Sequence, residues 1–245
     1  MTQLIEIAKK RFAESKRQQE PFTKIVAVDV FLNNIEEYPH AYVLGCLMDR
    51  QMKSERSWQI PYEICARLGT RKITELANVK KQDYTRLFRK NKLHRFNDTM
   101  ATVFYDAILR IKEIYNYDAS KIWSGRPSSA SVVYRFMEFN GGGIKIATMA
   151  ANLLVRCFKI PFSDYYSIDI SPDVHVRRVL LRMGHVHEDC MDNNAIIYKA
   201  RELNPEFPGI IDPVCFEIGR NYCRPANPKC DQCPVRNECQ THLNK

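Results

Sequence analysis

Four cysteines near the C-terminus are spaced closely enough to bind one metal centre. Cys223, Cys230, Cys233 and Cys239 form a C-x6-C-x2-C-x5-C array within seventeen residues. Four thiolates can hold a tetrahedral zinc ion or an iron–sulfur cube. Structural zinc sites usually pair two C-x2-4-C motifs, and only Cys230 and Cys233 have that spacing here, so the array favours iron–sulfur and leaves zinc as the alternative. The odd count of nine cysteines and an N-terminus without a secretory pattern disfavour disulfides.

A lysine follows three consecutive glycines between two expected helices. Residues 139–147 read FNGGGIKIA, which places Lys145 just after Gly141 and Gly143. Glycine permits positive φ and a close approach of the backbone, and the N-terminus of the following helix presents N–H groups to a phosphate. A lysine is nucleophilic only when neutral, and partial burial favours that form, so we expect Lys145 to be partly buried. The alternatives are an ordinary helix stop and a solvated surface lysine.

An aspartate begins the next polar motif along the chain. Asp173 opens the segment DVHVRRV, twenty-eight residues after Lys145. An aspartate that follows Ser171 and Pro172 is typical of a helix start, where its carboxylate accepts backbone N–H groups. The same carboxylate can also stabilise positive charge that develops on a reacting atom.

The glycine hairpin, the aspartate segment and the cysteine loop, in this order, resemble the helix-hairpin-helix DNA glycosylase superfamily, in its iron–sulfur, endonuclease III-like branch. The resemblance extends from Tyr38 to Cys239. Lys145 falls on the lysine that is the nucleophile of bifunctional members, and Asp173 falls on the family's catalytic aspartate. Gly141 and Gly143 fall on the two hairpin glycines.

The resemblance implies a mostly α, two-lobed fold with a C-terminal [4Fe-4S] cluster loop. One helical lobe, residues 38–168, would contain the hairpin. The second would combine residues 1–37 with 169–245 and hold the cluster within the loop 223–239. DNA would bind in a positive cleft between the lobes.

The resemblance also implies a base excision repair glycosylase with lyase activity on double-stranded DNA that contains a damaged, in the first instance oxidised, base or an abasic site. Lys145 would attack the sugar after the base is flipped out, and Asp173 would stabilise the departing charge. One alternative is a monofunctional enzyme in which Asp173 activates water. The others are a non-catalytic iron–sulfur DNA-binding protein and a small electron carrier.

DNA contacts are implied on both sides of the hairpin. Gln51 falls on the glutamine that fills the gap left by the extruded base. The basic segment 85–96 contains Arg89, Lys90 and Arg95, and either His94 or Arg95 falls where the family has a second, usually apolar wedge. A run of positive charge is also typical of a solvated face.

Further contacts are implied near the cluster. His175 and Arg178 fall on the family pattern that follows the aspartate, and His175 is expected to orient the helix or touch a phosphate. Arg224 and Lys229 lie within the first cysteine interval, where they would meet phosphates and make the cluster a scaffold for a DNA-binding loop.

Several positions depart from the family pattern. The hairpin has Phe139 and Asn140 where the family has Leu-Pro. The interval between Lys145 and Asp173 is longer than in typical members and includes Tyr165 and Tyr166, so the family's commonest substrate, an oxidised pyrimidine, does not carry over directly. Cys46 stands where adenine-excising members have a glutamate, which disfavours that substrate.

Composition supports a basic intracellular protein. The 245 residues are 45% hydrophobic, enough to bury a full core, and their formal net charge of +9 favours a nucleic-acid partner. No stretch is long enough to span a bilayer, so we expect a monomer in the cytoplasm, associated with the nucleoid, or in a nucleus, and not a secreted protein.

Helical periodicity predicts the elements that position these residues. We expect helices over 3–15, 38–49, 97–117, 144–158 and 171–183, the third capped by Asn97 or Asp98 and the last stopped by Gly184. The segment 124–131 is expected to be a loop that ends in a helix cap, and 25–30 is a weak strand candidate.

Overall fold

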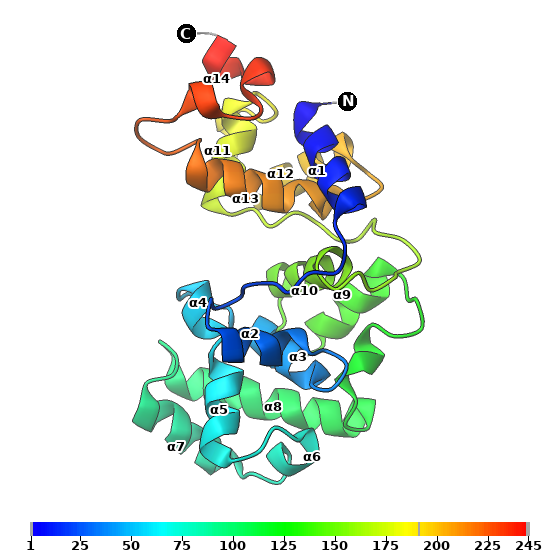
Figure 1. Cartoon of the computed structure of the whole chain (residues 1–245), viewed down its shortest axis with the longest axis vertical. Coiled ribbons are helices and arrows are strands. Elements are labelled where there is room, and N and C mark those ends of the chain that lie inside the picture. Colours follow the sequence, from blue (N-terminus) through cyan, green and yellow to red (C-terminus); the bar gives the residue numbers. More distant parts are fainter. Residues whose placement is uncertain (1, 191, 244–245) are drawn as a thin grey trace. The chain divides into compact units, whose positions relative to one another are not determined.

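The computed structural model describes residues 2–190 and 192–243, and this part of the chain consists of helices, turns and loops without a β-strand. The mostly α prediction is confirmed. The described helices fall into two compact units (Figure 1).

Unit 2, residues 17–162, carries the glycine hairpin. Its α-helices are α2 (Val26–Asn33), α3 (Pro39–Met48), α4 (Ser54–Ser57), α5 (Ile60–Leu68), α6 (Ile73–Leu76), α7 (Lys81–Asn91), α8 (Asn97–Tyr115), α9 (Ser129–Met137) and α10 (Ile144–Arg156), with one 3-10 turn, η1 (Ala119–Ile122).

Unit 1 joins residues 1–16 to residues 163–245. Its described α-helices are α1 (Gln3–Glu14), α11 (Val174–Arg182), α12 (Asn193–Leu203), α13 (Asp212–Asn221) and α14 (Gln240–Leu243), and its 3-10 turns are η2 (Glu188–Cys190), η3 (Pro208–Ile211), η4 (Cys230–Gln232) and η5 (Arg236–Glu238). Helix α1 comes from the blue end of the chain in Figure 1 and packs against η3 and α13 from the other end.

The unit boundaries differ from the expected lobe boundaries by residues 17–37 and 163–168. Residues 17–37 group with unit 2 because α2 packs on α3 and α5. Residues 163–168 group with unit 1, where the Ile168 carbonyl accepts a hydrogen bond from the Gly209 N–H at 2.7 Å.

Helix α3 is the centre of unit 2. All ten of its residues are buried, and it packs against α2, α5, α8 and α10. A helix that is apolar on every side is stable only where other helices surround it, and the segment PHAYVLGCLM has that composition. Pro39 occupies the first turn, where a missing N–H costs no helical hydrogen bond.

Two sequence predictions about secondary structure are wrong: the strand over 25–30 and the cap of helix α8. Residues 25–30 are not a strand, because α2 buries Val28, Phe31 and Leu32 along one helical face and this burial outweighs the β-propensity of its valines. Helix α8 has Phe96 at its N-cap and no side-chain cap, since Asn97 instead accepts from the His94 N–H at 3.1 Å.

Other predicted boundaries are close to those observed. Ser128 caps α9 by accepting from the Ser131 N–H, as the loop-then-cap prediction for 124–131 requires. Gly184, with φ of 82°, follows the end of α11, but that helix begins at Val174 and not at 171. Within the described residues, we find no helix both long and apolar enough to cross a bilayer.

An ion pair in unit 1 whose carboxylate is buried provides a test of stability. Both oxygens of Asp169, a side chain 8% exposed, accept from the Arg201 guanidinium at 2.8 Å. Arg201→Gln should lower the free energy of unfolding by about 3 kcal/mol, because it leaves a buried carboxylate without its cation.

The control is Lys199→Gln in the same helix, whose partner Glu202 is 68% exposed, so its loss should change stability by less than about 0.5 kcal/mol. Urea unfolding followed by circular dichroism compares the two, and equal losses would contradict the prediction.

Candidate functional site

Helices α3 and α10 form an antiparallel pair that positions the candidate residues of unit 2. The Tyr42 hydroxyl of α3 donates to the Ala150 carbonyl of α10 at 2.7 Å. At the other end of the pair, the Arg50 guanidinium lies so close to Gly141 that an added Cβ there would be 3.1 Å from Nη1. The C-terminal end of α3 and the N-terminal end of α10 therefore lie together.

The turn between α9 and α10 requires glycine for steric reasons. Gly141 has φ of 83°, and the Gly142 N–H donates to the Phe139 carbonyl at 2.8 Å, which closes a four-residue turn. A Cβ on Gly142 would lie 2.0 Å from the Phe136 carbonyl oxygen, whereas one on Gly143 would meet no atom within 4 Å. Gly143 is the N-cap of α10 and supplies no side-chain hydrogen bond, so the first N–H groups of α10 have no cap.

Lys145 and Gln51 line one pocket of 370 Å³. Its walls come from the loop after α3 and from the hairpin: Asp49, Arg50, Gln51, Gly141, Gly143, Ile144, Lys145 and Ile146. The tertiary structure thus brings together four residues that the sequence assigns to DNA. Lys145, in the first turn of α10, is exposed and not partly buried as expected.

A second loop is joined to the Gln51 loop through His94. His94 is buried, with its Nε2 3.1 Å from the Arg50 carbonyl oxygen. Of the two candidates for the second wedge, His94 is therefore the one without an exposed side chain. Arg95 and Phe96, which follow His94 in this loop, are both exposed, with the Arg95 guanidinium 5.4 Å from the centre of the Phe96 ring.

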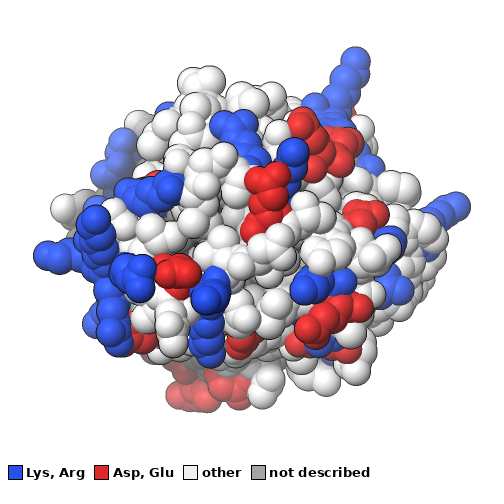
Figure 2. Space-filling view, turned by 90° about the horizontal axis from the view of Figure 1, so that it is seen from below, with Lys and Arg blue, Asp and Glu red and all other residues white. Residues whose placement is uncertain are grey.

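The basic segment is partly neutralised by neighbouring acids. Arg89 forms two hydrogen bonds with Asp98, at 2.5 and 2.8 Å, and Arg86 pairs with Asp83. Lys90 and Arg95 are exposed. Figure 2 shows Lys and Arg side chains gathered at the left edge of the face that it draws, the side on which Figure 1 places α7.

Asp173 in unit 1 is the N-cap of α11. Its Oδ1 accepts from the N–H groups of His175 and Val176, both at 2.8 Å, as the helix-start interpretation requires. Among the residues that the structure describes, no hydrogen bond to its Oδ2 is found, so this oxygen of the half-buried carboxylate is available to a ligand.

His175 and Arg178 attach α11 to the start of the cysteine loop. Arg178 donates to the carbonyls of Gly219 and Cys223 at 2.8 and 2.5 Å, and its Nη2 lies 3.1 Å from the His175 Nδ1. The His175 ring meets Phe216 edge-on at 5.2 Å. These contacts orient α11 and α13, which is one of the two roles expected of His175.

The four candidate ligand cysteines line one small cavity. Cys223, Cys230, Cys233 and Cys239 face it together with Arg182, whose guanidinium also donates to the Arg224 and Pro225 carbonyls. Burial raises the pKa of the Cys233 thiol, and the charges of the other three cysteines raise it further. Arg224 and Lys229 in the loop are exposed.

The donor set suits a thiolate-bound metal, but the thiols are not gathered as a metal would hold them. Within residues 2–190 and 192–243, no three His, Cys, Asp or Glu side chains form a group that could bind a metal ion. The cluster therefore stays a prediction.

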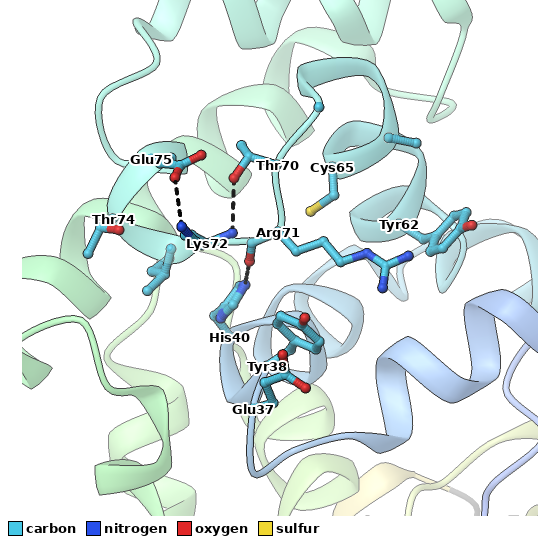
Figure 3. A pocket seen from close by; sticks show the side chains of 13 residues that line it. Glu37, Tyr38, His40, Tyr62, Cys65, Thr70, Arg71, Lys72, Thr74 and Glu75 are labelled. Atoms are coloured by element: carbon cyan, nitrogen blue, oxygen red, sulfur yellow. Dashed lines mark hydrogen bonds and ion pairs between the residues drawn. The ribbon is translucent and has the colours of Figure 1, made fainter.

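Another pocket of unit 2, with a volume of 780 Å³, lies elsewhere and contains none of the predicted site residues (Figure 3). Arg71 lies over the rings of Phe31, Tyr38 and Tyr62 at 5.3 to 6.0 Å, and its carbonyl bonds to His40. Burial lowers the pKa of His40 to about 4. These contacts attach the loop after α5 to α2 and α3, so we interpret the pocket as structural.

Comparison with known proteins agrees with this architecture. No family model matches the chain. The chain is similar to adenine DNA glycosylase of Schizosaccharomyces pombe, with 38% identity over 74 residues that span 29% of this chain and 16% of the yeast protein. It is also similar to endonuclease III of Thermotoga maritima, with 24% identity over 213 residues that span 87% of this chain and 88% of that enzyme.

Solved structures share the fold. A trapped covalent intermediate of endonuclease III with DNA covers 89% of this chain and 95% of its own, with a TM-score of 0.58 and 16% identity. A thermostable thymine-DNA glycosylase covers 99% of this chain and 98% of its own, with a TM-score of 0.63 and 12% identity.

The helical fold, with its glycine hairpin between α9 and α10, is thus the fold of endonuclease III and of thymine-DNA glycosylase. In sequence the chain is similar to two DNA repair enzymes, endonuclease III and adenine DNA glycosylase.

Sequence reasoning missed three residues of this site. Arg50 lines the pocket with Lys145, Asp49 accepts a hydrogen bond from Ser57 of α4, and Phe96 presents an exposed ring beside Arg95. Asp49 and Arg50 directly precede Gln51 in sequence, but only the packing of α3 on α10 places them at the hairpin.

The hairpin geometry predicts different outcomes for neighbouring glycines. Gly142→Ala should lower the free energy of unfolding by about 2 kcal/mol, because the new methyl group would overlap a backbone carbonyl that cannot move alone. Gly143→Ser, at an open N-cap position, should stay within about 0.5 kcal/mol of the parent protein. Chemical denaturation of both variants checks the prediction, which is wrong if the serine variant is the less stable.

Proposed function

We propose that this protein is a base excision repair DNA glycosylase with lyase activity, which acts on duplex DNA containing a damaged base or an abasic site. The observation that carries the proposal is the shared pocket of Gln51 and Lys145 at the end of the α3/α10 pair. When a nucleotide is flipped out, one residue fills the gap that its base leaves and a nucleophile attacks its sugar. Both residues must act on the same nucleotide, so they must lie at one site. The similar proteins named endonuclease III and adenine DNA glycosylase support the same class of reaction.

DNA binding would begin at backbone phosphates. The uncapped N–H groups at the start of α10 suit a phosphate, and Gly141 and Gly143 keep side chains out of its way. Lys90, Arg95, Arg224 and Lys229 would add phosphate contacts. Arg89 would contribute less, because it is already paired with Asp98.

The proposed chemistry begins when the damaged base leaves the helix and Gln51 takes its place. The neutral Lys145 amine attacks C1′, the N-glycosidic bond breaks, and the base leaves with a proton. The Asp173 carboxylate, through Oδ2, stabilises the positive charge that develops on the sugar. The C1′–O4′ bond then opens, O4′ takes a proton, and C1′ and the lysine nitrogen form a protonated Schiff base. Loss of a C2′ proton breaks the C3′–O bond by β-elimination, the 3′ phosphate leaves with the bonding electrons, and the strand is nicked.

The lesion is proposed to be an oxidised base. Tyr165 of the longer interval between Lys145 and Asp173 packs against Phe12 and Phe207, with ring centres at 6.0 and 5.0 Å, and Tyr166 is exposed. A panel of duplexes with oxidised pyrimidines, 8-oxoguanine, and thymine or adenine in mispairs identifies the base that is released.

Borohydride trapping tests the two catalytic residues. The parent protein should cross-link to lesion-containing or abasic DNA, and Lys145→Gln should abolish the cross-link while it keeps most DNA affinity, because the hairpin binds phosphate through backbone groups. Asp173→Asn should slow base release by at least about a hundredfold. It should still fold, since asparagine caps a helix as well as aspartate does.

The outcomes separate the alternatives. A parent protein that releases a base but never cross-links is a monofunctional enzyme, with Asp173 as the activator of water. One that binds damaged duplex but neither releases a base nor cross-links is a DNA-binding protein.

We also propose that Cys223, Cys230, Cys233 and Cys239 bind a [4Fe-4S] cluster. When bound, such a cluster supplies four iron–thiolate bonds that cross-link the loop, and it can exchange an electron. The chain's own contribution is to hold the loop by Arg178 and Arg182, which donate to three of its carbonyl groups.

Metal analysis of anaerobically purified protein should return about four irons per chain and a brown colour with absorbance near 400 nm. Cys230→Ser should remove iron and reduce solubility or DNA binding more than the rate of base release. One zinc and no iron would show that the alternative ligand geometry is correct.

A further inference from the structure

We propose that His94 is a positioning residue that fixes the loop carrying Gln51 to the loop carrying Arg95 and Phe96, so that both loops enter DNA as one unit. The inference rests on the proposed function for its meaning in DNA, but the coupling of the loops stands on contacts within unit 2.

The Gln51 loop needs support from its surroundings. Gln51 has φ of 49°, a left-handed conformation that costs a residue with a Cβ about 1 kcal/mol. Its side chain is exposed, so the conformation is not held by its own packing. Such a backbone persists only where neighbouring groups determine it.

Asp49 attaches the start of this loop to α4 and Trp58. Its Oδ1 accepts from the Ser57 hydroxyl at 3.1 Å, and its Oδ2 accepts from the Ser54 hydroxyl at 3.1 Å and the Trp58 indole N–H at 3.3 Å. Trp58 is fully buried and stacks on Phe22 with ring centres 4.1 Å apart. The loop thus starts from a rigid aromatic support.

His94 holds the other side. The Phe96 N–H donates to its Nδ1 at 3.0 Å, so that nitrogen carries no proton. The proton of the neutral ring is then on Nε2, which donates to the Arg50 carbonyl at 3.1 Å. Burial lowers the pKa of His94, which favours this neutral form.

One imidazole therefore bonds to the residue before Gln51 and to the residue after Arg95. The ring is 3% exposed, so water does not compete for either bond. Without the ring, no hydrogen bond from His94 would fix the position of one loop relative to the other.

Two substitutions of His94 each keep one of its two hydrogen bonds and remove the other. His94→Asn places an amide oxygen near the former Nδ1 and keeps the turn to Phe96, but it cannot reach the Arg50 carbonyl. His94→Gln places an amide N–H near the former Nε2 and keeps that bond. The matched control is His40→Asn, because His40 is equally buried and bonds to the Arg71 carbonyl at 2.9 Å at the opposite end of α3.

Hydrogen–deuterium exchange of the free protein tests the coupling without DNA. In His94→Asn, amides in both 49–53 and 93–97 should exchange at least about tenfold faster, as expected when a local contact is lost. His94→Gln should restore slow exchange in 49–53, and His40→Asn should leave both segments unchanged. Unchanged exchange in 49–53 of His94→Asn overturns the proposal, whatever the protein does to DNA.

A double-mutant cycle tests the consequence for DNA, using the preference for a duplex with a tetrahydrofuran abasic analogue over an intact duplex. Gln51→Ala and His94→Asn should each reduce this preference about tenfold, and the double variant should be no worse than Gln51→Ala alone. Additive losses would overturn the role of His94 through Gln51. A parent protein with coupled loops but no preference would instead refute the proposed function.

Discussion

The burial of α3 on every side is the constraint on which the rest of unit 2 depends. Because all ten residues of this helix are inside, it has one possible depth and one rotation among its neighbours. The Tyr42 hydroxyl is buried away from water and donates a hydrogen bond to the Ala150 carbonyl. This bond fixes the position of α3 along the axis of α10. The positions of Gln51 and Lys145 follow from that register.

Close backbone approaches make this arrangement rigid. Gly45 lets the Trp58 ring lie where a Cβ would be 2.5 Å from the ring, and Gly142 lets the hairpin turn lie on the end of α9. Each glycine removes a side chain where two elements must touch. The candidate DNA-facing loops therefore emerge from a support with little freedom to shift.

In unit 1, side chains at and within α11 form hydrogen bonds to backbone groups of the helix and of the cysteine loop. Asp173 caps the helix with one carboxylate oxygen, and Arg178 and Arg182 use their guanidinium groups to hold carbonyls of the cysteine loop. A structural role and a chemical role for Asp173 are compatible, since Oδ1 accepts both backbone N–H groups. The loop that would carry the cluster is thus already organised by α11 and α13.

The sequence was sufficient for the long helices, because their apolar periodicity and their stops at Gly184 and the hairpin are local signals. It was wrong where packing outweighed propensity, as in helix α2, and where a side chain accepted a hydrogen bond from a neighbouring turn instead of capping its helix, as Asn97 did with the His94 N–H. The candidate residues Lys145, Gln51 and Asp173 came from motifs.

Motifs could not predict three features of the site. These are the pocket shared by Gln51 and Lys145, the exposure of Lys145, and the bond from His94 to the Arg50 carbonyl. Motif spacing determines which residue types lie on an element and which turn follows it. The bond between residues 44 positions apart, and the shared pocket of residues 94 positions apart, depend on how buried helices pack against one another. Only the tertiary structure decides that, because the close packing of the core selects one arrangement from many with the same local pattern.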